Sequence, residues 1–266
     1  MIKLIEHERD FDRQLLLKTL SGRKILAYLK AYGTGYDFCR FYKVTDGNGK
    51  GFMFILNSTL IICADENLKA GEEIELFVNM NLPFRIEGTQ HILENIRMPD
   101  VYQKLNRTIF ELVPDEMPEK SVAEHVDMNP NLKDVYNILS EGFPNISEFS
   151  LWYTDTSHRC RFGISRTFTY RNSTTASAVY DIEDVVLVGQ VATTTTARGQ
   201  GYARDFLKWL AGFFSSLGKK SYLMALDIRV SFYREIGFKE VEKEIVLERI
   251  DVKKESVTKG KLDNEQ

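Results

Sequence analysis

Residues 185–218, VVLVGQVATTTTARGQGYARDFLKWLAGFFSSLG, decide the fold. The segment opens with a nearly continuous apolar run from Val185 to Val191, which predicts a buried strand. Four threonines and a short glycine-containing loop follow, and the remainder has apolar residues at helical spacing. Gly218, with two lysines after it, is typical of a helix C-terminus. The segment therefore predicts a strand, a loop and an amphipathic helix, in that order.

The loop between the predicted strand and helix has the composition of an anion-binding site. The first turn of a helix leaves backbone N–H groups without internal partners, and the helix dipole adds partial positive charge there. Gly199 and Gly201 carry no side chain that would block a phosphate, and Arg198 adds a permanent cation. A pyrophosphate suits such a loop. The common nucleotide fingerprints GxxxxGKS/T and GxGxxG are both absent from it.

Two motifs occur in one order along the second half of the chain. Arg198, Gly201 and Ala203 match R-x-x-G-x-A, and residues 232–238, FYREIGF, match FYxxxGF. Together they resemble the acyl-coenzyme A loop, (Q/R)-x-x-G-x-(G/A), and the closing motif of the GNAT superfamily of N-acetyltransferases. The resemblance covers roughly residues 130–250. Residues 152–163, WYTDTSHRCRFG, are similar to bacterial two-domain proteins of this type.

The resemblance implies a cofactor, acetyl-CoA, and a role for each matching residue. Backbone groups of Val191, Ala192 and Thr193 would pair with the pantetheine arm where the sheet splays. The pyrophosphate would lie against the loop formed by Arg198, Gly199, Gln200, Gly201, Tyr202 and Ala203. The amine would attack the thioester directly, and Tyr233 would protonate the leaving thiolate, as a positioned phenol can.

One position departs from the family pattern. Many members carry a cofactor-contacting asparagine seven residues before the tyrosine, where this chain has Leu226 followed by Asp227. The departure puts the cofactor contact from this helix in doubt, and Arg229 offers a substitute. The general base is not specified, and its candidates remain open: they are Asp155, His158, Glu183 and Asp184.

The first half predicts a similar unit without the cofactor loop. Residues 8–31 have a helical pattern, and residues 36–56 predict a hairpin whose turn explains the glycines at 47–51. Residues 58–65 and 72–80 predict further strands, residues 89–97 a short helix, and residues 108–113 a strand. We expect a degenerate GNAT-like domain that shapes the acceptor site or a dimer interface.

These patterns predict a mixed α/β (α+β) fold in two domains. The expected divisions are a degenerate N-terminal domain at 1–113, a linker at 114–121, an acyl-CoA-binding domain at 122–250 and a disordered tail at 251–266. The second domain should have a mixed, splayed sheet flanked by helices.

Composition narrows the classes of partner. The 266 residues carry a net charge of −3, which argues against a nucleic-acid or anionic-membrane surface. The longest apolar runs are strand-sized and the first residues lack a signal-peptide pattern, so a cytoplasmic protein is expected. The cysteines, Cys39, Cys63 and Cys160, are too widely spaced for a metal knuckle, and no metal site is expected.

The favoured function is acetyl-CoA-dependent N-acetyltransfer to a small-molecule or peptide amine. A non-catalytic acyl-CoA sensor or regulatory protein remains the alternative, because Leu226 departs from the pattern and no base is identified. A scaffold that has lost the cofactor is a further alternative, which the intact Arg198–Ala203 motif disfavours. The sequence leaves the acceptor unidentified and a homodimer open.

Overall fold

The computed structural model describes residues 1–114 and 120–250. The predicted linker at 114–121 lies mostly outside the described residues, and the predicted tail at 251–266 lies entirely outside them.

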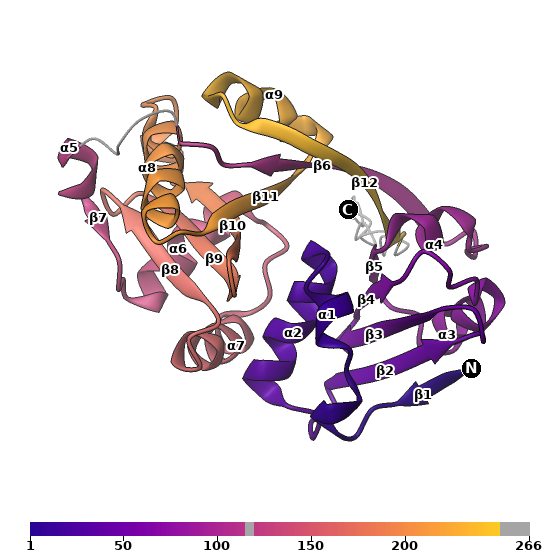
Figure 1. Cartoon of the computed structure of the whole chain (residues 1–266). Helices are drawn as coiled ribbons and strands as arrows, with labels where there is room; N and C mark the ends of the chain where they lie inside the picture. Colours follow the sequence, from indigo (N-terminus) through magenta and orange to yellow (C-terminus); the bar gives the residue numbers. More distant parts are fainter. Residues whose placement is uncertain (115–119, 251–266) are drawn as a thin grey trace, which may run out of the picture.

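The strands of the described residues form one twelve-stranded sheet (Figure 1). In chain order they are β1 Ile2–Leu4, β2 Cys39–Thr45, β3 Lys50–Leu56, β4 Thr59–Ala64, β5 Arg85–Gly88, β6 Tyr102–Glu111, β7 Val126–Asp127, β8 Arg166–Tyr170, β9 Thr174–Ile182, β10 Val185–Thr193, β11 Lys220–Leu226 and β12 Lys239–Arg249. Their order in the sheet is β1-β2-β3-β4-β5-β12-β6-β11-β10-β9-β8-β7. The β4–β5 and β10–β11 pairs are parallel, and the other pairs are antiparallel.

Helices flank this sheet, which confirms the predicted mixed α/β fold. The α-helices are α1 Arg13–Leu16, α2 Leu20–Tyr32, α3 Gly71–Asn81, α4 Gln90–Asn95, α5 Lys120–Ala123, α6 Leu132–Gly142, α7 Phe149–Arg161, α8 Tyr202–Ser216 and α9 Asp227–Ile236. Two 3₁₀ turns, η1 Glu8–Asp10 and η2 Thr195–Ala197, complete the described elements. In each half a strand is followed by two helices, three strands, a helix, a strand, a helix and a final strand.

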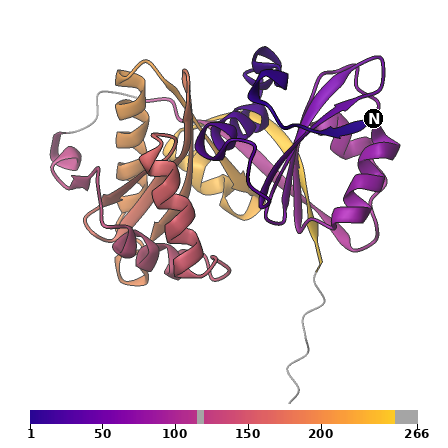
Figure 2. The ribbon, with the colours of Figure 1, turned by 90° about the horizontal axis from the view of Figure 1, so that it is seen from below.

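The final strands of the two halves cross over (Figures 1 and 2). Strand β12, at the end of the second half, lies between β5 and β6 of the first. Strand β6, at the end of the first half, pairs with β11 of the second. Each half therefore contributes a strand that completes the sheet of the other, and the division at 114–121 stays a prediction.

A buried ion network lies where the halves join. Glu87 on β5 accepts hydrogen bonds from Lys24 on α2 and from Arg107 on β6, the latter at 2.8 Å from Nη1 to Oε2. The Arg107 Nη2 atom lies 2.5 Å from Oε1 of Glu244 on β12. Because the four side chains come from four elements of the junction, their pairing stabilises the crossed arrangement.

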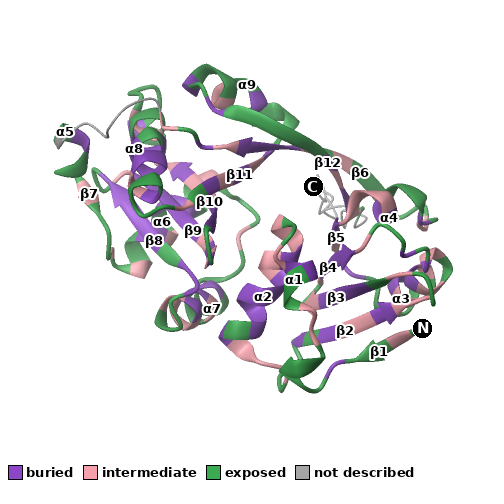
Figure 3. Ribbon diagram, viewed as in Figure 1, coloured by how far each residue is buried: buried purple, intermediate pink, exposed green. Residues whose placement is uncertain are grey.

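Helix α2 packs between the two halves and gives them a shared core. Its Ile25 and Leu29 lie in one buried cluster with Phe54 of β3 and with Tyr180 and Leu187 of β9 and β10. Figure 3 shows buried residues along α2 and the adjoining strands. A second cluster, between α8 and the other face of β8 to β11, supports the elements of the predicted cofactor loop.

The prediction of a strand at 72–80 is wrong, because these residues belong to helix α3. Ile74, Leu76, Val78 and Met80 alternate along the sequence as they would in a strand. In the structure only Ile74 and Val78, four residues apart, are buried, and Leu76 and Met80 are 64% and 85% exposed. Burial at helical spacing, which the alternation concealed, explains the error.

Candidate cofactor site

Strands β10 and β11 part at their C-terminal ends. Their parallel pairing runs from Val185 opposite Lys220 to Val188 opposite Leu223. Beyond this point β10 continues to pair with β9, and β11 continues to pair with β6. The sheet therefore splays from Gly189 onward, two residues before the stretch at Val191 to Thr193 to which the resemblance assigned the splay.

A bulge accompanies the splay. The β10–β9 register shifts between Gly189 and Ala192, and Gln190 has a left-handed φ of 52°. Such a bulge turns the backbone of the strand locally. Of the predicted pantetheine contacts, Val191 and Thr193 are half-buried and line this stretch, and Ala192 is buried under α6. The Gly189-Gln190 pair interrupts the apolar run, and a glycine inside a strand is a sequence signal for such a bulge.

The predicted phosphate loop joins η2 to α8 and is exposed. Gly199 and Gly201 have left-handed φ values of 79° and 78°, and Gly201 is the N-cap of α8. No side chain caps this helix N-terminus, and a Cβ atom built on either glycine would meet nothing within 4 Å. The N–H groups from Gly201 to Ala203 can therefore receive an anion in the open space beside them. Buried Phe206, Leu207, Leu210 and Phe214 fix the helix to the sheet.

Arg198 holds the shape of the loop as well as adding charge to it. Its Nε atom donates to the carbonyl of Thr193 at 3.2 Å, and its Nη2 atom donates to the carbonyl of Glu141 at 2.9 Å. Gln200, also exposed, reaches back to the carbonyl of Thr196 at 3.5 Å. The sequence predicted a phosphate contact for Arg198, whereas the structure also uses it to tie the loop to β10 and α6.

Glu141 of α6 holds the loop, a role that was not predicted from the sequence. Its Oε2 atom accepts a hydrogen bond from the N–H of Thr195 at 2.6 Å, across 54 positions of chain. This hydrogen bond, with the nearby charge of Arg198, lowers the pKa of the Glu141 carboxyl group. A carboxylate with a lowered pKa is a weak base, so we assign Glu141 to holding the loop. The local sequence contains no signal for so distant a contact.

Tyr233 lies on α9, across the splay from the loop helix. Its half-buried ring contacts Phe110 of β6 and Phe232, with centroid distances of 5.5 and 5.2 Å. Burial raises the pKa of the Tyr233 phenol, and the charge of Arg229 opposes this shift. The phenol is therefore protonated at neutral pH, as a proton donor must be. Leu226, where many family members have asparagine, is the N-cap of α9 and is exposed.

Two of the predicted base candidates lie at the contact between α7 and α2. The carboxylate of Asp155 accepts a hydrogen bond from the Tyr32 hydroxyl at 2.7 Å and pairs with Arg159. The His158 Nε2 atom lies 2.8 Å from the carbonyl of Ala31, and the imidazole stacks on Tyr32. Both side chains therefore join the halves.

The other two base candidates lie at the turn between β9 and β10, at the opposite end of β10 from the loop. Glu183 pairs with Arg13 of α1, and Asp184 pairs with Arg23 of α2 at 2.9 Å. All four candidates are thus engaged by the first half.

The corresponding loop of the first half, between β4 and α3, is filled by the chain's own carboxylates. Asp65 Oδ1 accepts from the N–H groups of Asn67 and Leu68 at 3.1 and 3.0 Å, and Asp46 Oδ2 accepts from that of Lys69 at 2.5 Å. The N–H groups of Asn67, Leu68 and Lys69, just before α3, thus already have anionic partners.

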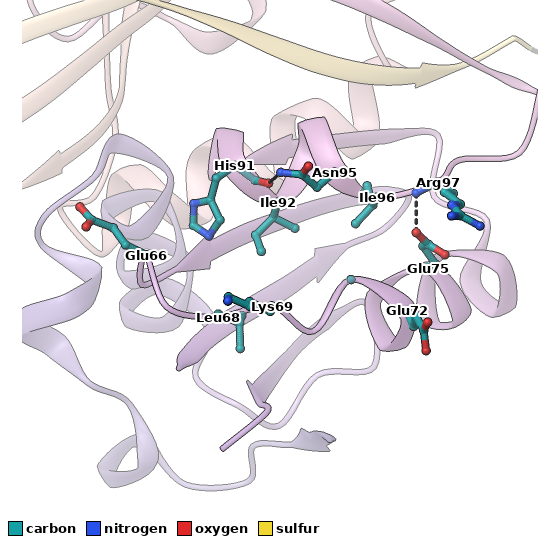
Figure 4. A pocket seen from close by; sticks show the side chains of 11 residues that line it. Glu66, Leu68, Lys69, Glu72, Glu75, His91, Ile92, Asn95, Ile96 and Arg97 are labelled. Atoms are coloured by element: carbon teal, nitrogen blue, oxygen red, sulfur yellow. Dashed lines mark hydrogen bonds between the residues drawn. The ribbon is translucent and has the colours of Figure 1, made fainter. Parts of the chain in front are cut away.

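The β4–β5 pair is also closed where β10–β11 is open. The Ala64 N–H donates to the Thr89 hydroxyl at 2.9 Å, and the Thr89 N–H donates to the carbonyl of Ile62. A neighbouring cavity of about 550 Å³ between α3 and α4 is lined by three glutamates, Glu66, Glu72 and Glu75 (Figure 4). The closed strands leave no free edge for the extended arm of coenzyme A, and the cavity carries both signs of charge, because Lys69 and Arg97 also line it.

A second cavity, of about 930 Å³, lies between the halves. Its walls include Lys18 of the first half and Tyr222 of β11. Tyr222 lies one residue before Leu223, the last residue of β11 that pairs with β10. Acidic groups are contributed by Asp184, Glu242 and Glu244. The cavity thus lies over the paired ends of β10 and β11, on the face of the sheet that α2 covers.

Comparisons with known proteins identify the fold. Neither protein-family models nor curated sequences match the chain. Among solved structures, a GCN5-related N-acetyltransferase from Sphaerobacter thermophilus matches with a TM-score of 0.56 and 14% identity over 87% of this chain and 86% of its own. A GNAT-family acetyltransferase from Colwellia psychrerythraea matches with a TM-score of 0.51 and 14% identity over 94% of this chain and 100% of its own. The chain has the GNAT fold.

Two kinds of feature are absent from the described residues. None of their helices combines the length and apolar character needed to cross a bilayer. No group of three or more His, Cys, Asp or Glu side chains among them could hold a metal ion.

Proposed function

We propose that the chain is an acetyl-CoA-dependent N-acetyltransferase whose second half binds the cofactor. One observation carries the proposal: a 3₁₀ turn and a short glycine loop connect the uncapped N-terminus of α8 to the strand that splays from β11. The splay offers unpaired strand edges to an extended amide-containing arm, and the loop offers N–H groups to a pyrophosphate. Both features are needed for acetyl-CoA, and they occur together.

Each residue then has a definite task. Backbone groups at Val191 to Thr193 orient the pantetheine arm, and the N–H groups at Gly199 to Ala203 hold the pyrophosphate. Acetyl-CoA supplies the acyl group as an activated thioester. The neutral acceptor nitrogen bonds to the acyl carbon as the carbon–sulfur bond breaks, and the Tyr233 hydroxyl gives its proton to the departing sulfur. The proton that the nitrogen loses passes through water and restores the Tyr233 phenol.

The first half, in this proposal, does not bind coenzyme A. Asp46 and Asp65 occupy its loop N–H groups, and Thr89 closes its strands. Its contribution is to the cavity between the halves, where we place a small-molecule or peptide amine. Carboxylates on that cavity favour a protonated amine. A cytoplasmic location and a homodimer stay predictions from the sequence.

A second function, a non-catalytic acyl-CoA sensor, is favoured by the contacts of the four base candidates, which all pair with residues of the first half. Asp184 lines the cavity between the halves, but it is paired there with Arg23. An acetyltransferase must take a proton from its amine, and these side chains are committed to the junction of the halves. Turnover separates the two functions.

The test is release of free thiol from acetyl-CoA in the presence of amines of graded size and charge. Amine-dependent thiol release that requires Tyr233 supports the enzyme. Tight binding of acetyl-CoA, with no thiol release for any amine, would favour the sensor.

A further inference from the structure

The turn between β8 and β9 lies beside the proposed phosphate loop. Its Arg171 and Asn172 have left-handed φ values of 51° and 49°. The Thr194 N–H, just after β10, donates to the carbonyl of Ser173 at 2.8 Å, and the Thr174 and Thr193 hydroxyls lie 3.1 Å apart. The turn is thus fixed to the end of the strand that leads into the loop.

Arg171 projects from this turn onto the first residue of α8. Its guanidinium carbon lies 5.5 Å from the centre of the Tyr202 ring and 5.4 Å from that of Tyr170. Its Nε atom donates to the Tyr170 hydroxyl at 3.1 Å. Two aromatic faces and one hydrogen bond therefore orient an exposed cation.

The position of this cation suits a second phosphate. Tyr202 is the first residue of α8, so its own N–H belongs to the group that would face the pyrophosphate. The Arg171 guanidinium therefore lies about the length of one tyrosine side chain from the Tyr202 N–H group, which would face the pyrophosphate. In coenzyme A a ribose ring separates the pyrophosphate from the 3′-phosphate, which is a spacing of the same order.

We propose that Arg171 recognises the 3′-phosphate of coenzyme A and makes the site selective for coenzyme A over its 3′-dephospho form. This inference rests on the proposed function. Arginine suits the task because its planar fork donates two parallel hydrogen bonds to phosphate. The hydrogen bond to Tyr170 and, more weakly, the charge of Asp205 in the first turn of α8 raise the pKa of Arg171, so this side chain stays cationic.

The alternative, a solvated surface arginine, makes a different prediction. A surface arginine that only makes the electrostatic potential of the site more positive would strengthen the binding of coenzyme A and of 3′-dephospho-coenzyme A by a similar factor. A cation that contacts the 3′-phosphate strengthens the binding of one form only. The comparison of the two ligands therefore separates these roles.

The experiment measures dissociation constants of coenzyme A and 3′-dephospho-coenzyme A by calorimetry. The variant Arg171→Asn suits the left-handed backbone, which asparagine tolerates well, and so preserves the turn. Arg161→Asn, at an exposed arginine in the last turn of α7, is the matched control. Thermal unfolding without ligand checks that each variant is folded.

We expect the unsubstituted protein to bind coenzyme A at least about tenfold more tightly than the dephospho form, the factor expected of one charge-assisted hydrogen bond. Arg171→Asn should remove this preference and leave the dephospho affinity unchanged, and Arg161→Asn should alter neither. Equal binding of both ligands by the unsubstituted protein, or an equal loss for both in Arg171→Asn, would overturn the role of Arg171 while leaving the proposed function intact. Binding of neither ligand would overturn both.

Discussion

The most specific test of the proposed phosphate site is the substitution Gly201→Ala, which adds one methyl group. The Gly201 φ of 78° is left-handed, so Gly201→Ala strains the backbone, and the new Cβ would point into space where no protein atom lies within 4 Å. We propose that a phosphate occupies this space. Left-handed geometry costs a non-glycine residue about 1–2 kcal/mol, which for a chain of this size lowers the melting midpoint by roughly 2–8 °C.

The same helix supplies the matched control. Gly218, at the other end of α8, has a φ of 71°, and a Cβ there also meets nothing within 4 Å. Gly218→Ala should therefore lower stability by a similar amount. Only Gly201→Ala should weaken acetyl-CoA binding, by about 10- to 100-fold, because it displaces one or two charge-assisted hydrogen bonds.

Calorimetric titration of both variants with acetyl-CoA, alongside unfolding without ligand, measures the two effects separately. If Gly201→Ala binds acetyl-CoA as tightly as Gly218→Ala does, the phosphate does not lie against the N-terminus of α8, and the reasoning fails.

Three further predictions concern the proton donor, the loop and the junction. Tyr233→Phe should lower turnover about 100-fold at an unchanged dissociation constant for acetyl-CoA, and unchanged turnover would make the tyrosine a packing residue. Because burial raises the pKa of Tyr233, turnover by the unsubstituted protein should hold until above pH 10 and fall as the phenol ionises. Arg198→Ala removes hydrogen bonds to two carbonyls and should weaken acetyl-CoA binding about tenfold in calorimetry, and an unaltered affinity would contradict the role of this clamp. Burial alone would raise the pKa of Glu87, but Lys24 and Arg107 lower it to about 2, so the stabilisation of about 3 kcal/mol from this group is present above pH 4.5 and is lost as the pH falls towards 2. Glu87→Gln should lower the free energy of unfolding by about 3–5 kcal/mol at neutral pH, measured in denaturant, and should flatten this acid dependence. Equal stability of the variant and the unsubstituted protein would show that the network contributes nothing.

The local sequence was sufficient to predict those elements whose structure depends mainly on neighbouring residues. The order of apolar run, glycine loop and amphipathic helix at 185–218 predicted β10, the loop and α8, because each depends on neighbouring residues. The alternation at 72–80 misled, because a short helix with buried positions four apart can show the same alternation. Propensity at this length is ambiguous, and packing against the sheet decided the outcome.

Long-range arrangement was beyond local reasoning. Nothing in residues 239–249 indicates that β12 lies between two strands of the first half, since any edge with matching side chains would accept it. The same limit applies to the site: Glu141 and Arg171 approach the loop only through the fold, and Asp155 and Glu183 are held by partners in the first half. The position of a carboxylate in the sequence therefore did not predict whether it lies near the splay between β10 and β11.

The central claim is tested most directly by titrating the purified protein with acetyl-CoA and following thermal unfolding, with ATP and NAD as controls. At about 100 times the dissociation constant, a ligand of the native state adds roughly 2.7 kcal/mol, which shifts the midpoint by several degrees for a chain of this size. The account predicts such a shift with acetyl-CoA and little or none with ATP or NAD. No shift at millimolar acetyl-CoA would contradict it, and would leave the splay and the loop of the second half without a cofactor.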